Sequence, residues 1–136
     1  MKKSIIFVFL LLLVFTAGCS ASGPAADTEK SSQTFRQISQ EEAKEMMAKD
    51  DGHVVVDVRR QDEYDAGHIP GAILIPNESI GCDSPEALPD YDQIILVYCR
   101  SGNRSKQAAQ KLASMGYTNI YEFGGITTWT GDVVTD

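Results

Sequence analysis

Residues 94–105 have the sequence IILVYCRSGNRS. The apolar run before Cys99 predicts a strand buried on both faces, as in parallel sheets. A helix is predicted after Ser105, because apolar residues up to Leu112 recur at helical spacing and Gly116 provides a stop signal. Cys99 and the residues that follow it therefore lie at the carboxyl end of a strand, where α/β folds bind their ligands.

The rest of the chain repeats this alternation of strands and helices. Residues 54–58 (VVVDV) predict a second buried strand, and Ser39 with Glu42 predicts a capping box that starts a helix. The pattern predicts a doubly wound α/β domain around a mostly parallel central sheet of about five strands. Shorter elements are expected at residues 34–38, 61–66, 72–75 and 119–122, with a surface connection containing one helical turn at 76–92 and a helical segment around Trp129.

The amino-terminal residues resemble an export signal. Lys2 and Lys3 precede an apolar run at residues 5–15, which is too short to span a bilayer comfortably. Small residues then lead into Cys19, as in the lipobox of bacterial lipoproteins, although Thr16 replaces the usual aliphatic residue. The resemblance implies a lipoprotein signal peptide at 1–18 and a lipidated Cys19. Ordinary cleavage to a soluble exported protein, or an uncleaved anchor, are the alternatives.

The segment after the signal separates an anchor from a folded domain. Residues 19–33 are small and polar, which predicts a flexible tether, and residues 34–136 suffice for one domain. Without residues 1–18 the chain has ten Lys and Arg against nineteen Asp and Glu. This acidic balance argues against nucleic acid as a partner and gives no help in binding anionic lipid. We expect an extracytoplasmic, membrane-anchored monomer.

The cysteines and histidines have no metal-site spacing. Cys82 and Cys99 remain once Cys19 is assigned to the lipid, and an exported compartment permits disulfides. His53 and His68 have no suitably spaced partner, so neither a structural metal site nor a Ser-His-Asp arrangement is supported.

The surroundings of Cys99 favour a reactive thiolate. Backbone N–H groups at a helix N-terminus, together with Arg100 and Arg104, lower the pKa of a cysteine. Gly102 allows the tight bend that such a loop requires. A buried, inert cysteine, or a disulfide between Cys99 and Cys82, is the alternative reading.

Three motifs in the correct order resemble the rhodanese-like single-domain sulfurtransferases. They are CRSGNRS at 99–105, VDVRRQDEYDAGHIPGAILIP at 56–76, and a Gly-Tyr, Gly-Gly and Trp pattern between 116 and 129. The resemblance covers about residues 35–131. A single loop motif would be a weak signal, whereas three in order are specific.

The resemblance implies sulfur transfer through a covalent intermediate, without an organic cofactor or metal. Cys99 would take the outer sulfur of thiosulfate or a polysulfide as a persulfide and pass it to cyanide or a thiol. A loop would cradle that persulfide; its residues are Arg100, Ser101, Gly102, Asn103, Arg104 and Ser105. From Cys99 to Arg104 the loop is one residue shorter than the C-x5-R loop of related phosphatases, which suits a sulfur atom better than a phosphoryl group.

The other matched residues have simpler interpretations. Arg59 and Glu63 are four residues apart and are expected to pair as scaffold. Asp57 ends a strand, and two interpretations of it are open: a structural role, or a supporting role near the site together with Arg59. His68 is interpreted as a hydrogen-bond donor in a turn, and Trp129 as a core residue.

Other functions remain open at this point. The chain could be a membrane-tethered persulfide carrier or redox partner with little free turnover, docking to a protein thiol. It could also be a non-catalytic anion-binding domain, although retention of Cys99 argues against this. Cys82 is a candidate to attack the Cys99 persulfide.

Overall fold

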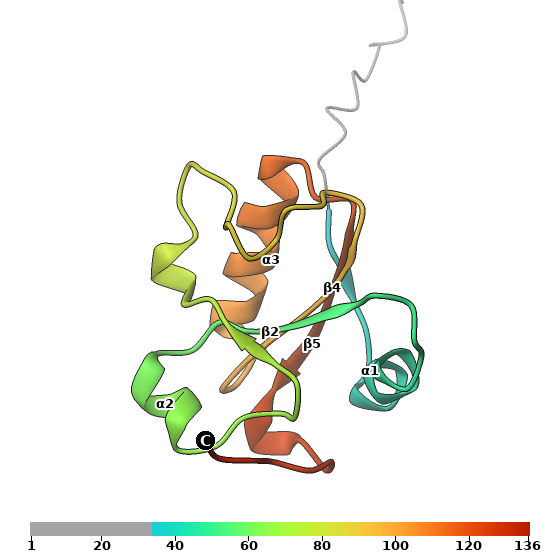
Figure 1. Cartoon of the computed structure of the whole chain (residues 1–136), viewed down its shortest axis with the longest axis vertical. Helices are drawn as coiled ribbons and strands as arrows, with labels where there is room; N and C mark the ends of the chain where they lie inside the picture. The colour runs from blue at the N-terminus through green and yellow to red at the C-terminus, as the bar shows by residue number, and fades with distance from the viewer. Residues whose placement is uncertain (1–33) are drawn as a thin grey trace, which may run out of the picture.

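A parallel five-stranded sheet organises the computed structural model, which describes residues 34–136. The strand order is β1-β5-β4-β2-β3, and each neighbouring pair runs parallel (Figure 1). The doubly wound α/β fold is therefore confirmed. The elements are β1 (Arg36–Gln37), α1 (Gln40–Met47), β2 (Val54–Asp57), α2 (Gln61–Asp65), β3 (Ile73–Leu74), η1 (Asn77–Ser79), β4 (Ile94–Cys99), α3 (Asn103–Met115), β5 (Asn119–Gly125) and η2 (Ile126–Thr128).

The predicted signal peptide (1–18), tether (19–33) and lipidated Cys19 lie outside the described residues. Within residues 34–136, no helix is long and apolar enough to cross a membrane.

Local sequence signals set most of the boundaries. Ser39 caps α1, and its Oγ accepts a hydrogen bond of 3.1 Å from the backbone N–H of Glu42. Gly116 ends α3 in the left-handed conformation, with φ of 109°, as its position in the sequence predicts. The main difference is β5, which continues past the expected end at Glu122 to Gly125 because it pairs with β4 as far as Cys99.

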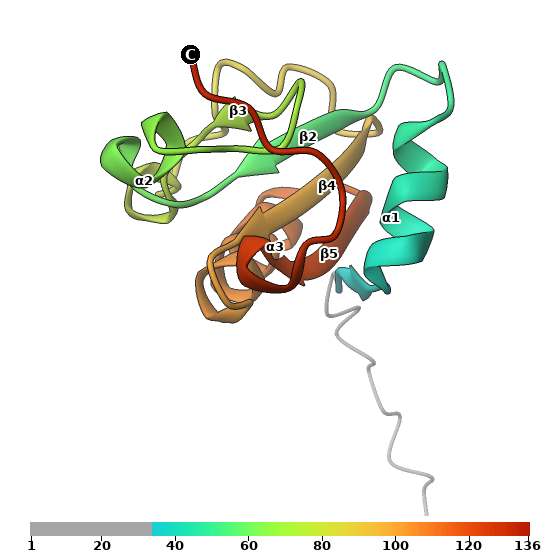
Figure 2. The ribbon, with the colours of Figure 1, turned by 90° about the horizontal axis from the view of Figure 1, so that it is seen from below.

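Helices cover both faces of the sheet. Figure 2 shows α1 on one side and α3 on the other. On the α3 face, Leu112 packs against Ile95 and Val97, whereas Ala43 of α1 packs against Leu96 on the opposite face. These apolar residues are at most 1 % exposed, so alternate residues of β4 point into two separate cores.

The connection between η1 and β4 is not a purely surface segment, contrary to the sequence-based expectation. Ile80 and Leu88 are 2 % and 1 % exposed and belong to the core on the α3 face. The carbonyl of Leu88 also accepts a hydrogen bond of 2.6 Å from the Tyr117 hydroxyl. The expectation was wrong because isolated apolar residues between prolines show no periodicity that marks them as buried.

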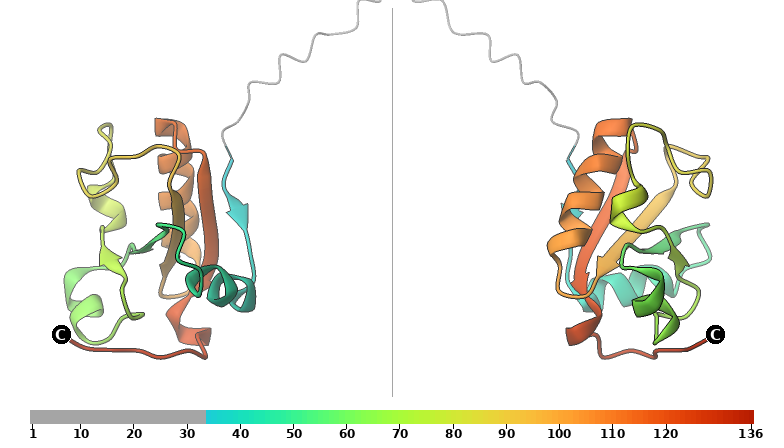
Figure 3. Two further views of the ribbon diagram at one scale, coloured as in Figure 1. Left: turned by 45° about the vertical axis from the view of Figure 1, so that its right-hand side comes forward. Right: turned by 90° about the vertical axis from the view of Figure 1, so that its left-hand side faces the viewer.

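The carboxyl-terminal residues return across the carboxyl ends of the strands. After η2 the chain runs to the neighbourhood of α2, as Figure 3 shows. There, Val134 pairs with His68 in an antiparallel bridge with hydrogen bonds of 2.9 and 2.8 Å. Residues 130–136, which we call the C-terminal strap, thus tie the end of the chain to the turn after α2.

Candidate active site

The Cys99 loop, defined as residues 99–105, joins β4 to α3 at the carboxyl edge of the sheet. Cys99 is 1 % exposed, and its Sγ accepts a hydrogen bond of 3.0 Å from the backbone N–H of Gly102. The hydroxyl of Ser105 lies 3.5 Å from the same sulfur. Gly102 reaches this position with φ of 103°, a conformation that residues with a Cβ rarely adopt.

The hydrogen bonds of the loop stabilise a thiolate. Burial by itself raises the pKa of Cys99, but the Ser105 hydroxyl and the N–H groups of Ser105, Gly102 and Ser101 lower it. The net pKa lies below the ordinary value for a thiol. The loop therefore prepares Cys99 to act as a nucleophile, because the thiolate is the reactive form of cysteine.

The loop is held from outside by the end of β5 and by η2. The carbonyl of Arg100 accepts hydrogen bonds from the backbone N–H and the hydroxyl of Thr127, at 3.2 and 2.9 Å. At Gly125 a Cβ would lie only 2.1 Å from that carbonyl oxygen. The Gly-Gly pair found in the sequence therefore leaves the space that the Cys99 loop occupies.

The predicted loop residues separate into three groups. Ser101, Gly102 and Ser105 supply donors near the sulfur, while the exposed side chains of Arg100 and Asn103 point to solvent. Arg104 is instead paired with Glu63 of α2 through two hydrogen bonds of 2.6 and 2.8 Å.

The expected pairing of Arg59 with Glu63 is wrong. Glu63 binds Arg104, and it accepts a hydrogen bond of 3.1 Å from the backbone N–H of Arg60. The Arg104 guanidinium holds the pKa of Glu63 at about 2, well below its usual value. Arg59 turns the other way, into the protein, because the carboxylate of Asp57 lies there.

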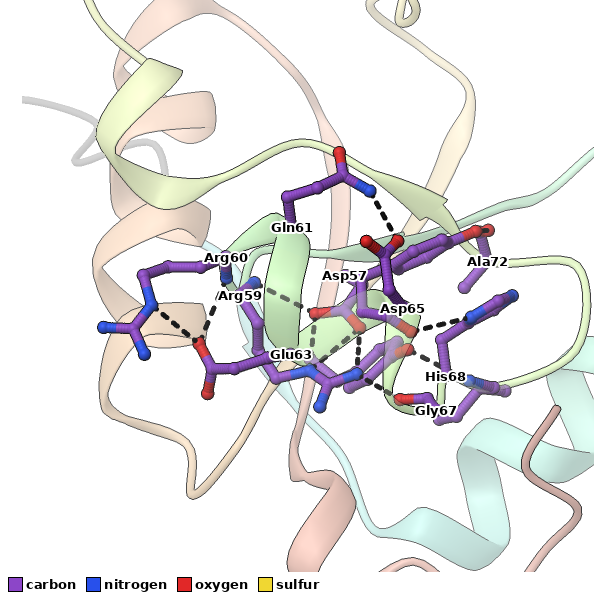
Figure 4. Close-up of polar contacts among 12 residues, drawn as sticks. Asp57, Arg59, Arg60, Gln61, Glu63, Asp65, Gly67, His68 and Ala72 are labelled. Atoms are coloured by element: carbon purple, nitrogen blue, oxygen red, sulfur yellow. Dashed lines mark hydrogen bonds and ion pairs between the residues drawn. The ribbon is translucent and has the colours of Figure 1, made fainter. Parts of the chain in front are cut away.

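The β2 corner, defined as residues 57–67, contains a buried ion pair (Figure 4). Arg59 donates from Nη2 to Asp57 Oδ2 at 2.6 Å and to the carbonyl of Gly67 at 2.7 Å. Asp57 is fully buried and Arg59 is 5 % exposed. Asp57 pairs in register with Tyr98, and the Arg59 guanidinium lies over the ring of Tyr98. The next residue, Cys99, belongs to the core on the α3 face. The structure thus places Asp57 and Arg59 beside the strand of the nucleophile and away from its sulfur.

His68 and Trp129 have structural surroundings. The Nδ1 of His68 lies 3.1 Å from the carbonyl of Tyr64, and the two rings stack with centroids 3.8 Å apart. Trp129 packs against the core on the α1 face. Among residues 34–136, no three His, Cys, Asp or Glu side chains lie close enough together to hold a metal ion.

Sequence reasoning missed Glu122, which lies on β5 behind the loop. Its side chain is 2 % exposed, and Oε1 accepts a hydrogen bond of 2.6 Å from the Ser105 hydroxyl. The only available signal is a carboxylate within a buried strand, two residues before the Gly-Gly pair, because burial of a charge normally requires partners.

Cys82 is remote from the nucleophile along α3. Both cysteines are free thiols, and Cys82 is exposed in a pocket of about 340 Å³ lined by Gln110 and Ser114. Gln110 lies five residues beyond Ser105, about 8 Å along the helix axis. The arrangement does not support the alternative of a direct disulfide with Cys99, because a disulfide needs Cα atoms within about 7 Å.

The fold and site define a parallel α/β domain in which main-chain N–H groups at a strand end hold a cysteine. The Rhodanese-like domain family matches residues 39–132. The chain is 41 % identical over 96 residues to the thiosulfate sulfurtransferase GlpE of Pseudomonas entomophila, covering 70 % of this chain and 84 % of that protein. It is 38 % identical to the thiosulfate sulfurtransferase PspE of Escherichia coli, covering 52 % and 68 %.

A solved structure agrees with these relatives. The structure described as rhodanese with anions from E. coli superimposes with a TM-score of 0.57 at 33 % identity, covering 62 % of this chain and 99 % of that chain. The chain therefore belongs to the rhodanese-like domain family, and it is an enzyme of the rhodanese type.

Proposed function

We propose that the protein moves sulfane sulfur from thiosulfate or a polysulfide to a thiophilic acceptor through a Cys99 persulfide. The observation that carries this proposal is the 3.0 Å hydrogen bond from the Gly102 N–H to Cys99 Sγ, within a loop that lowers the pKa of the thiol. Its relatives are named thiosulfate sulfurtransferases, which supports thiosulfate as one donor.

In the first half-reaction the Cys99 thiolate attacks the outer sulfur of the donor. A bond forms between Cys99 Sγ and that sulfur, and the S–S bond of thiosulfate breaks, so sulfite leaves with the bonding electron pair. The terminal sulfur of the persulfide carries a negative charge, which main-chain N–H groups of the loop stabilise as an oxyanion hole would. Arg100 is exposed beside Cys99 in the sequence and is placed to attract an anionic donor.

In the second half-reaction an acceptor attacks the terminal sulfur. Cyanide leaves as thiocyanate, or a thiolate leaves as a new persulfide, and the Cys99 thiolate returns. The two half-reactions share one covalent intermediate, so ping-pong kinetics are expected. The alternative is a membrane-tethered carrier or redox partner, which would load once and discharge only to a protein thiol.

The experiment uses the full chain in mild detergent, reduced and then treated with thiosulfate or polysulfide, alongside Cys99→Ser. Intact mass should show a gain of one sulfur atom in the wild type, lost on addition of cyanide and absent from the variant. Rapid repeated thiocyanate formation supports an enzyme with free turnover, whereas a single slow turnover supports the carrier. No gain of sulfur with any donor contradicts both.

We further propose that the protein is exported and held at the membrane by lipidated Cys19. The motif at residues 16–19 and the apolar run before it support this proposal. Metabolic labelling with a fatty acid should mark the wild type but not Cys19→Ala. Labelling of neither chain, with both found in the soluble exported fraction, would favour ordinary signal cleavage.

A further inference from the structure

A buried carboxylate is connected to the Cys99 thiol by a single hydroxyl group. Ser105 Oγ lies 2.6 Å from Glu122 Oε1 and 3.5 Å from Cys99 Sγ. Ser105 is fully buried and Glu122 is 2 % exposed. The three side chains come from α3, β5 and β4, so the tertiary structure alone brings them together.

The hydroxyl of Ser105 has one hydrogen, and three acceptors lie within reach of it: the carboxylate of Glu122, the sulfur of Cys99 and the carbonyl of Gly102, which is 3.0 Å from Oγ. When Glu122 is ionised, its oxygen takes that hydrogen, and the Cys99 thiol donates to Ser105 Oγ. When Glu122 is protonated, it donates to Ser105 Oγ, and the hydroxyl hydrogen turns to the Cys99 thiolate. The Cys99–Ser105 and Ser105–Glu122 hydrogen bonds are kept in both arrangements, with their directions reversed.

Other donors hold the carboxylate in place. Oε1 also accepts a hydrogen bond of 2.9 Å from the Gly124 N–H, and Oε2 accepts one of 3.2 Å from Gln37 of β1. Gly124 has φ of 91°, a left-handed conformation in which its N–H is turned to the side chain two residues earlier. The carboxylate is thereby fixed with one oxygen facing Ser105.

We infer that Glu122 accepts the Cys99 proton through Ser105, as a positioning residue that also stores the proton. The thiol proton passes to Ser105 Oγ while the hydroxyl proton of Ser105 passes to Glu122 Oε1. A thiolate and a neutral carboxylic acid thus replace a thiol and a carboxylate, and no further reactant is required. This inference rests on the proposed function, because it supplies the thiolate for the first half-reaction.

The stored proton has a route to solvent. An open pocket of about 410 Å³ is lined by Glu122 together with Gln37, Gly102 and Lys106. Lys106, which has no contact with the carboxylate, is the charged group on α3 that shares this pocket, and Gln37 on β1 is neutral. The side chain of Glu122 therefore lines an open pocket, through which the stored proton can reach solvent.

The test is the rate at which iodoacetamide alkylates Cys99 in the full chain, followed by mass spectrometry of the Cys99 peptide. Glu122→Gln keeps the shape of the side chain, and the Gly124 N–H holds the amide oxygen toward Ser105, where it cannot take up a proton. General-base assistance is worth about 100-fold or more. We expect a loss of that order near pH 6.5, and recovery to within a few-fold near pH 10, where hydroxide removes the thiol proton directly.

Three controls accompany this variant. Glu45→Gln makes the same change of charge at an exposed position of α1 and should react as the wild type does. Cys82 in the same sample reports the reactivity of a free thiol and should not change. Ser105→Ala interrupts the relay at its centre and also removes a hydrogen bond that itself lowers the pKa of Cys99, so a wild-type rate in this variant overturns the relay even if Glu122→Gln does not fold.

A variant that reacts at the wild-type rate near pH 6.5 would overturn the relay, and so would an equal loss at every pH, which indicates structural damage. Alkylation needs no sulfur donor, so this result is separate from the test of sulfur loading. Normal pH-dependent alkylation without any sulfur gain would leave the relay standing and reject the sulfurtransferase proposal.

Discussion

Two neighbouring strand ends handle charge in opposite ways. At the β2 corner the carboxylate of Asp57 and the guanidinium of Arg59 neutralise each other in the interior, and the spare Nη2 donor goes to Gly67. At the Cys99 loop the sulfur is surrounded by N–H and O–H donors, and within residues 34–136 no fully buried cation lies against it. A charge that is already paired holds the fold, whereas donors directed at one atom are available for an anion that forms during a reaction.

Breaking the β2 corner should give the largest effect, and it should be an effect on stability. Arg59→Ala leaves Asp57 buried without its partner, and loss of one member of a buried pair costs about 3–5 kcal/mol. Chemical denaturation should show this decrease in the free energy of unfolding. The folded fraction should still load sulfur on Cys99; loss of loading from correctly folded protein would mean that the corner takes part in the chemistry.

Displacing the Cys99 loop should affect activity more than stability. Gly125→Ala places a Cβ 2.1 Å from the carbonyl oxygen of Arg100, so the loop must move. A shift of about 1 Å in a catalytic group can cost about 100-fold in rate. Rates of sulfur loading should fall by that order. Gly81→Ala is a matched control, because neither glycine has a positive φ and a Cβ at Gly81 meets nothing within 4 Å.

Removing the Glu63–Arg104 ion pair, which links the β2 corner to the Cys99 loop, should have a smaller, pH-dependent effect on stability. Arg104 lowers the pKa of Glu63 from 4.5 to about 2. The contribution of this pair to the free energy of unfolding is therefore complete above pH 4.5 and is lost as the pH falls toward 2. Glu63→Gln should cost about 1 kcal/mol at neutral pH, as expected for a partly exposed pair. The difference from the wild type should vanish in acid, and a difference independent of pH would contradict this assignment.

The smallest effect is expected at Cys82. Cys82→Ser changes an exposed residue in a pocket beside the carboxyl-terminal half of α3. Turnover and sensitivity to oxidation should remain as in the wild type. A clear decrease in either would restore the hypothesis that Cys82 takes sulfur from Cys99, and would require a movement of the connection that carries it.

Local patterns predicted the parts of the molecule that depend on neighbours in sequence. The run of apolar residues before Cys99, the cap at Ser39 and the stop at Gly116 each act within a few residues, and the structure has them as expected. The pairing of Glu63 with Arg104 spans 41 residues, and the sequence offered Arg59 as a nearer partner. A short separation is a poor guide when a buried carboxylate competes for the same guanidinium.

Glu122 shows the same limit of prediction from sequence. It lies in a strand whose residues alternate between two cores, and nothing in its own neighbourhood marks the carboxylate as paired. Its side-chain partners come from β1 and α3, so its link to Cys99 follows only from the way in which the sheet and helix are packed.

The parallel sheet also gives the domain two distinct ends, one at the amino edge and one at the carboxyl edge of the strands. All five strands run in one direction (Figure 1), so the chain enters β1 from the amino edge of the sheet. Cys99 ends β4 at the other edge. Arg36 is level with Leu96, three residues or about 10 Å before the sulfur. An anchor attached upstream of β1 would hold the domain at the amino edge of the sheet. The Cys99 loop would then lie at the opposite edge and face an approaching sulfur acceptor.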